Sequence, residues 1–145
     1  MDGRDFLHLA NSLLSGSTQA EWRTAISRAY YAAFHVAREL LLNCQFSVPR
    51  GEQAHAYLWL RLSNSSHAGV ISAGRDLKAV RSSRNWADYD LHNPLDQPAA
   101  AAQVQIAADI IRVLDIAGHD PLKTHITGAM KIYERDVLKD VTWQP

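Results

Sequence analysis

Cysteine is almost absent from this chain, since Cys44 is the only one among 145 residues. A single cysteine cannot form a disulfide within one molecule, and no activating partner stands beside it, so we interpret Cys44 as a packing residue at a helix end. The chain has neither an apolar run of membrane-spanning length nor a secretory signal at its N-terminus. These absences predict a cytoplasmic protein without a membrane partner.

An excess of charge of one sign is missing as well. The 15 lysines and arginines balance 15 aspartates and glutamates, which excludes the broad basic field of a non-specific nucleic-acid binder but leaves room for a local basic patch. The chain also lacks an HExxH motif, paired Cys-x-x-Cys motifs and a glycine-rich phosphate loop. We therefore expect neither a metal ion nor a cofactor.

The period-two pattern of half-buried strands is also missing. Apolar residues recur at intervals of three and four, which predicts an all-α protein, and 145 residues is the usual size of one domain. Short connections favour antiparallel neighbours, so we expect one domain over residues 1–145, an up-and-down bundle of five to six helices. The expected helices run over about Asp5–Leu14, from a Thr18 cap to about Cys44, over about Glu52–Leu62, from near His67 to Tyr89 or Leu91, from Asp96 or Gln97 to Gly118, and from Pro121 to about Asp140.

The longest expected helix carries polar residues beside its apolar face. Its sequence from Glu21 to Leu42, EWRTAISRAYYAAFHVARELLL, places Arg28, Tyr31 and His35 one after another along the margin of that face. Side chains at such a margin lie within reach of a neighbouring helix. We therefore treat these three residues as candidates for a binding site.

A second polar stripe is expected near the end of the fourth helix, in RSSRNWADYDLH. Its members are spaced by three or four residues, and Arg84 and Asp88 form an i,i+4 pair. On an isolated helix, such a stripe is usually a solvated face whose ion pairs contribute a few tenths of a kcal/mol. The members of the stripe are Arg81, Arg84 or Asn85, Asp88 and His92.

Together the two stretches are recognisable. SRAYYAAFHVARELL, followed about forty residues later by RSSRNWADYD, resembles the HEPN family of small helical-bundle proteins, and the resemblance covers roughly residues 20–118. It implies a homodimer whose protomers pair their motifs across a cleft. It also implies a possible small nucleotidyltransferase-like antitoxin as partner. Many HEPN proteins are metal-independent endoribonucleases with an arginine, often a polar residue after it, and a histidine after four to six intervening residues.

The chain departs from that motif at the histidine. Arg84 and Asn85 match its first half, but the three positions open to the histidine hold Tyr89, Asp90 and Leu91. His92 comes one residue too late, and a helix turns by about 100° per residue, so this slip re-aims the imidazole. The sequence Ala-Asp-Tyr at residues 87–89 instead resembles a branch of the family that lacks the histidine.

Three hypotheses follow from these observations. In the first, the protein is a dimeric, non-catalytic module in a toxin–antitoxin or defence context, and it binds RNA, a nucleotide or a protein partner. In the second, it is a divergent ribonuclease toxin that uses Arg84 with His92 or Tyr89. In the third, the stripes are polar networks that fix the register of the core. The candidate ligand-binding residues are Arg28, Tyr31, His35, Arg81, Arg84, Asn85 and Asp88.

The C-terminal helix and the remaining histidines lead to further expectations. Met130, Ile132, Tyr133, Val137, Leu138 and Trp143 provide apolar surface that covers either a second protomer or the core of its own protomer. The charged residues between them, Lys131, Glu134, Arg135, Asp136, Lys139 and Asp140, are typical of a solvated face. His55, on the third helix, lies outside the context of the two stripes.

Overall fold

The computed structural model describes residues 1–145 and confirms the all-α class. None of its helices combines the length and the apolar character needed to cross a membrane. The helices lie within a few residues of the expected bounds, except at the C-terminus. They are α1 (Asp5–Leu14), α2 (Gln19–Asn43), α3 (Gln53–Leu62), α4 (Ala68–Tyr89), α5 (Gln97–Ala117), α6 (Leu122–Tyr133) and the π-helical turn η1 (Glu134–Leu138).

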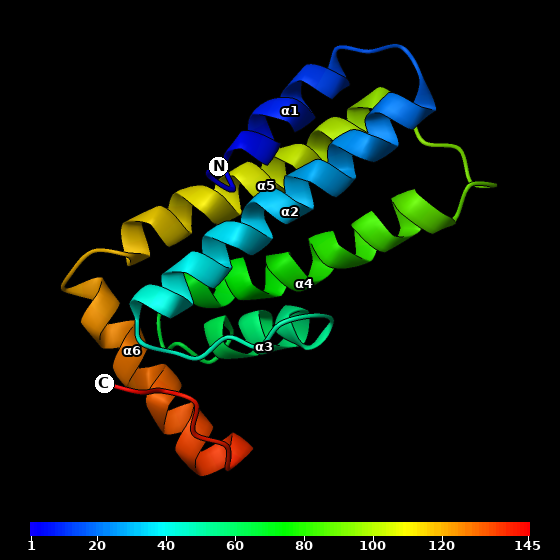
Figure 1. Cartoon of the computed structure of the whole chain (residues 1–145). Helices are drawn as coiled ribbons and strands as arrows, with labels where there is room; N and C mark the ends of the chain where they lie inside the picture. The colour runs from blue at the N-terminus through cyan, green and yellow to red at the C-terminus, as the bar shows by residue number, and fades with distance from the viewer.

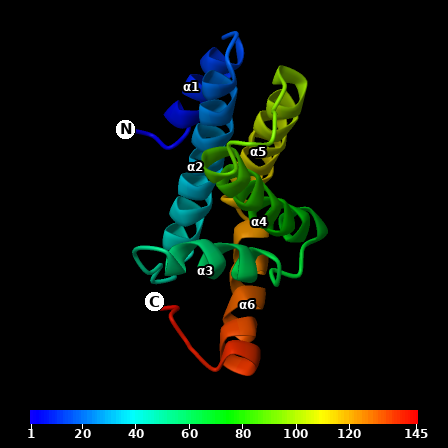
Figure 2. The ribbon, with the colours of Figure 1, turned by 90° about the vertical axis from the view of Figure 1, so that its right-hand side faces the viewer.

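Four of the helices form an up-and-down bundle. Figure 1 shows α1 and α4 running in one direction and α2 and α5 in the opposite one. The helix α2 is central, since it packs against α1, α4 and α5. The short helix α3 lies across one end of the bundle, and α6 extends beyond that end (Figure 2). This arrangement places the second half of α4 along α2.

Local sequence accounts for the start of α2 and for its central place. Thr18 Oγ1 accepts a hydrogen bond from the backbone N–H of Glu21 at 3.2 Å, and its hydroxyl donates to the Glu21 carboxylate at 2.7 Å. The predicted helix start at Thr18 is thus confirmed as a cap that couples these two side chains. The helix then buries small residues, which let the backbones of its neighbours approach: Ala25, Ala29, Ala32, Ala33 and Ala37.

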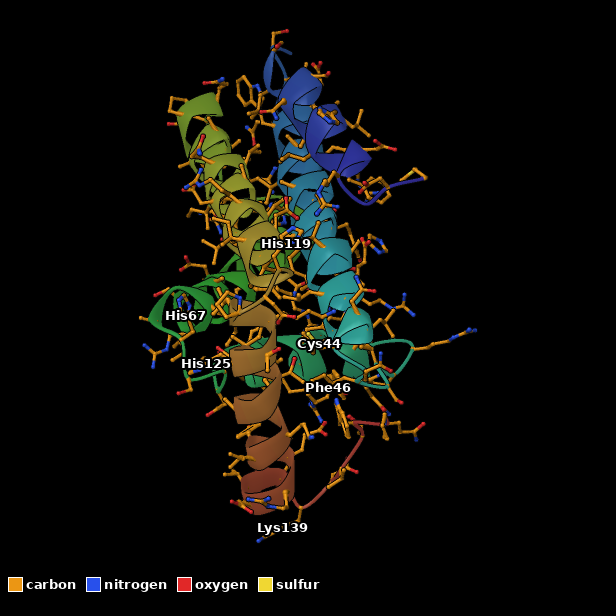
Figure 3. The ribbon with its side chains drawn as sticks, turned by 90° about the vertical axis from the view of Figure 1, so that its left-hand side faces the viewer. Cys44, Phe46, His67, His119, His125 and Lys139 are labelled. Carbon is orange, nitrogen blue, oxygen red and sulfur yellow. The ribbon has the colours of Figure 1, made fainter.

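The C-terminal segment differs from the expectation of one helix to Asp140. The helix α6 ends at Tyr133, and after η1 the chain turns at Lys139, whose φ of 56° is left-handed. The following tail runs back along the start of the α2–α3 connection, where Trp143 forms an antiparallel bridge with Phe46. In Figure 3, Lys139 marks the turn and Phe46 lies beside the returning tail.

A buried ion pair explains this turn. Glu134 is fully buried, and its carboxylate accepts a hydrogen bond from Arg61 Nε of α3 at 2.7 Å. The same carboxylate accepts the backbone N–H groups of Thr142 at 2.9 Å and Trp143 at 3.1 Å, together with the Thr142 hydroxyl. The prediction that Glu134 belongs to a solvated face is therefore wrong.

Two apolar residues of the C-terminal segment cover the core of their own protomer. Met130 is buried, and Trp143 packs on the core.

One glycine of α4 allows the α3–α4 turn to pack closely. A Cβ atom on Gly74 would lie 2.7 Å from the backbone nitrogen of Ser63 and 2.9 Å from Leu62 Cβ. Helix propensity alone favours alanine by about 1 kcal/mol. Because overpacking against backbone costs about 1–3 kcal/mol, we expect Gly74→Ala to lower the free energy of unfolding, as measured by urea denaturation.

Gly128 of α6 provides the matched control. A Cβ atom there meets nothing within 4 Å, so Gly128→Ala is expected to raise the free energy of unfolding by up to about 1 kcal/mol. Equal effects of the two substitutions would contradict the steric explanation at Gly74.

Candidate functional site

The structure brings the two predicted polar stripes together on one surface. Because α2 packs against α4, the Tyr31 ring lies between two guanidinium groups. The carbon Cζ of Arg84 is 5.1 Å from the ring centroid, and that of Arg28 is 5.2 Å from it. We call the surface formed by Arg28, Tyr31, Arg81, Arg84 and Asp88 the arginine surface.

Hydrogen bonds hold Arg84 at the centre of the arginine surface. Its Nη1 donates to Asn85 Oδ1 at 2.8 Å, and its Nε lies 3.1 Å from Asp88 Oδ2. The second contact is an ion pair without hydrogen-bond alignment, because the buried Nε has no hydrogen-bond acceptor. Ser27 of α2 donates to the same Asp88 oxygen at 3.3 Å. The predicted i,i+4 pair is formed, and a hydroxyl ties it to α2.

Arg81 faces the first turn of α3 instead. Its Nη2 donates to Glu52 Oε2 at 2.7 Å, while its buried Nε lacks a hydrogen-bond partner. The Glu52 side chain is 83% exposed, and an ion pair with so exposed a carboxylate stabilises the fold by less than about 1 kcal/mol. An anion from solution can therefore replace Glu52 at little cost.

His55 lies next to this cluster, so the expectation that it stands apart from the stripes is wrong. Its Nδ1 is hydrogen-bonded to the hydroxyl of buried Tyr30, and the two rings stack with centroids 5.7 Å apart. Burial lowers the pKa of His55, and the charges of Arg81 and Arg84 lower it further. Burial also raises the pKa of Tyr30 well above its usual range. His55 is thus a neutral imidazole beside two cations.

His35 lies at the α1 side of α2, in aromatic packing. It stacks on Phe6 of α1 at 5.7 Å between ring centroids and meets Phe34 edge-on at 5.3 Å. Burial lowers the pKa of His35, with a smaller contribution from Arg38. Its recorded contacts are those of a packing residue, although Phe6 also lies 5.3 Å from the guanidinium of Arg28.

Tyr89 and His92 are placed away from the centre of the arginine surface. Tyr89 is the last residue of α4 and is 75% exposed, and His92 is exposed in the loop that follows. Tyr89 comes five positions after Arg84, which puts it about 140° further around the helix. Neither side chain forms a hydrogen bond, an ion pair or a cation–π contact with Arg84.

Arg23 is a buried cation that sequence reasoning did not single out. It donates to the carbonyl oxygens of Ala87 at 2.9 Å and Asp90 at 3.1 Å, and also to that of Asn93. Its guanidinium lies 5.1 Å from the Trp86 ring. These bonds fix the end of α4, one turn beyond the arginine surface. The signal in the sequence is an arginine one turn before Ser27, on the side of α2 that faces α4.

A cavity of about 470 Å³ lies on the other flank of α4, lined in part by Ile26, Ser83, Trp86 and Leu95. No lysine or arginine lines this cavity, so it lacks the positive charge that phosphate recognition requires.

The structure gathers no group of three or more histidine, cysteine, aspartate or glutamate side chains able to hold a metal ion. Comparison of the chain with protein-family models, with curated proteins and with solved structures finds no match.

Proposed function

We propose that this protein is a HEPN-like module that binds the phosphodiester backbone of RNA at the arginine surface without cleaving it. One observation carries the proposal. Arg81 is paired only with the exposed carboxylate of Glu52 and keeps an Nε without a hydrogen-bond partner, on a surface that it shares with Arg84 and Arg28. A guanidinium held so weakly has donors to offer, and a phosphate oxygen is an acceptor that can take the place of the Glu52 carboxylate at Arg81 Nη2.

The chemistry of the surface fits RNA. Guanidinium groups bind phosphate bidentately, and Arg81 is held only by the exposed carboxylate of Glu52. The half-buried Tyr31 ring holds the guanidinium groups of Arg28 and Arg84, and planar guanidinium groups stack with unpaired bases of RNA. The site is small, which agrees with the absence of net charge on the chain.

The lack of a histidine at the motif position argues against cleavage. Cleavage of RNA without a metal needs an acid and a base at the scissile phosphate. The position for the motif histidine holds Tyr89, Asp90 or Leu91, and both Tyr89 and His92 lie away from Arg84. The ribonuclease alternative, with Arg84 and either His92 or Tyr89, is thus supported less well than binding.

The homodimer and the antitoxin partner form the second part of the proposal, and they follow from the family resemblance. Two large apolar side chains, Tyr89 and Leu91, are exposed two positions apart in the chain at the end of α4, with 75% and 67% of their surface accessible. Such residues favour association with a second protomer. In a cytoplasmic toxin–antitoxin pair, a small nucleotidyltransferase-like protein would be the partner.

RNA binding is expected to fall when the arginines are removed. A hydrogen bond to a charged group contributes about 1.5–3 kcal/mol, so Arg81→Ala and Arg84→Ala should each weaken binding of a short oligouridylate about tenfold or more. Each lost phosphate contact should also reduce the salt dependence of the affinity by about one in the logarithmic slope. Fluorescence anisotropy over a series of salt concentrations measures both.

Two further variants control this experiment. Arg75 lies on the same helix and is exposed, so Arg75→Ala changes the charge equally and should leave the affinity within about twofold. Glu52→Gln frees Arg81 and should strengthen binding, an effect that unfolding cannot produce.

The outcomes separate the three hypotheses. Binding that is equal in wild type, Arg81→Ala and Arg84→Ala would refute the proposal. If those two variants also unfold at lower temperature, the stripes are structural networks. Cleavage of RNA in the presence of a chelator, abolished by Arg84→Ala or His92→Ala, would establish the ribonuclease instead.

A further inference from the structure

We propose that His55, oriented by Tyr30, is a third RNA-binding group of the arginine surface and takes up a proton when a phosphodiester binds. This inference rests on the proposed function and adds to it a residue and a dependence on pH. It comes from α3, which neither polar stripe includes.

The hydrogen bond to Tyr30 fixes how the imidazole is presented. The Tyr30 hydroxyl keeps its proton because burial raises its pKa, and His55 Nδ1 is its one hydrogen-bond partner, so we assign the hydroxyl as the donor of this bond. In the neutral ring the proton then sits on Nε2. This nitrogen has no hydrogen-bond partner in the chain and is not among the fully buried polar atoms. His55 as a whole is only 7% exposed, so this donor is the part of the ring that a ligand can reach.

The position of Glu52 shows where that ligand would lie. Glu52 precedes His55 by three residues, which places both on one face at the start of α3. The carboxylate of Glu52 occupies the acceptor position at Arg81 Nη2, at 2.7 Å. A phosphodiester that replaces this carboxylate at Arg81 lies within one helical turn of His55.

The charges around His55 determine the sign of the proton linkage. Arg81 and Arg84 of α4 disfavour the imidazolium, Glu52 of its own helix favours it, and Tyr30 of α2 is neutral. A bound phosphodiester offsets the two guanidinium charges and adds a negative charge beside the ring. The protonated form of His55 then becomes more favourable, so binding takes up a proton from solution. This proton goes to Nδ1, and the Tyr30 hydroxyl turns from donor to acceptor of the same hydrogen bond.

The expected result is an affinity for oligouridylate that increases as the pH falls. Neither its uracil bases nor its phosphodiesters titrate between about pH 5.5 and 8, the range in which a histidine changes charge. One linked proton changes the affinity by at most about tenfold per pH unit. We expect a gain of about three- to tenfold across this range for the wild type, and a much smaller one for His55→Gln.

Calorimetry measures the proton directly. Titrations in two buffers of different ionisation enthalpy should show uptake of a fraction of a proton by the wild type and none by His55→Gln. Tyr30→Phe should still bind oligouridylate but take up a different fraction of a proton, because the His55 imidazole loses the hydrogen bond that orients it. The matched control is His119→Gln, at an exposed histidine between α5 and α6 in Figure 3, which should leave the uptake unchanged.

These experiments test the role of His55 separately from the proposed RNA binding. If binding depends on Arg81 and Arg84 but the wild type takes up no proton, or if His55→Gln takes up as much as the wild type, the role of His55 is refuted and the proposed function stands. Absence of any arginine-dependent binding refutes both. Circular dichroism and urea denaturation of each variant establish that it is folded before it is titrated.

Discussion

Replacing Glu134 by alanine is expected to lower the free energy of unfolding by about 3–5 kcal/mol, because it leaves a buried cation without its partner. The guanidinium of Arg61 is 3% exposed, and Glu134 is its ion-pair partner. The same change removes the acceptor of the Thr142 and Trp143 N–H groups. The tail should therefore detach from the α2–α3 connection as well. Urea denaturation measures the loss, and hydrogen exchange of residues 141–145 measures the detachment.

The neighbouring pair of Arg135 and Asp136 provides the control for this prediction. Its nitrogen–oxygen distance is also 2.7 Å, but both side chains are more than half exposed, so Asp136→Ala should cost less than about 1 kcal/mol. A double-mutant cycle with Arg61→Met isolates the pair, since removing both charges should cost less than the sum of the single changes. A loss below about 1 kcal/mol for Glu134→Ala would contradict the burial of a true ion pair.

The pH dependence of stability should change in the same variant. Burial by itself raises the pKa of Glu134, but the hydrogen bonds from Thr142 and Arg61 outweigh it, and the pKa lies below the usual value of 4.5. A carboxyl whose folded pKa is depressed stabilises the fold fully above its unfolded pKa and loses that contribution as the pH falls through the folded pKa. We therefore expect the wild type to lose stability below about pH 4.5 more steeply than Glu134→Ala does.

Local sequence predicted most of the helices because their ends carry local signals. Thr18 and Asp96 cap α2 and α5 through hydrogen bonds to residues three positions later, and such pairs are visible in the sequence. The end of α6 was not predictable in this way. Glu134 is buried because Arg61 meets it from α3, 73 residues earlier in the chain, and no periodicity within the last helix indicates that partner.

The candidate site, too, was predicted from the sequence only in part. The stripes on α2 and α4 follow from spacings of three and four, and antiparallel packing of these helices brought Tyr31 against Arg84. His55 was missed because its context depends on how α3 crosses the end of the bundle. Its bond to Tyr30 joins residues 25 apart. Arg23 was missed because its one signal, a position one turn before Ser27, lies outside both polar stripes. Its partners are backbone carbonyls at the end of another helix.

Replacing Arg23 by alanine is expected to lower the free energy of unfolding by about 2–4 kcal/mol. The side chain is 7% exposed and bonds three backbone carbonyls, those of Ala87, Asp90 and Asn93. Without it, the buried carbonyl of Ala87 is left unpaired at a cost of about 1–3 kcal/mol, and the carbonyls of Asp90 and Asn93, which lie nearer to solvent, add a smaller loss. Urea denaturation should show the loss, and hydrogen exchange should increase first in the loop over residues 90–95. Arg38→Ala, on the same helix and without such bonds, should change stability by less than about 0.5 kcal/mol.

A lysine at position 23 separates charge from geometry. The ammonium group keeps the positive charge, but as a compact point charge it cannot reproduce the planar fork with which Arg23 reaches carbonyls from both α4 and the following loop. Arg23→Lys should therefore recover less than half of the stability lost in Arg23→Ala. Full recovery would mean that the charge alone, set against the partial negative charge at the C-terminus of α4, holds the helix end. In either variant the folded fraction should still bind oligouridylate, because Arg81 and Arg84 are held by contacts that do not include Arg23.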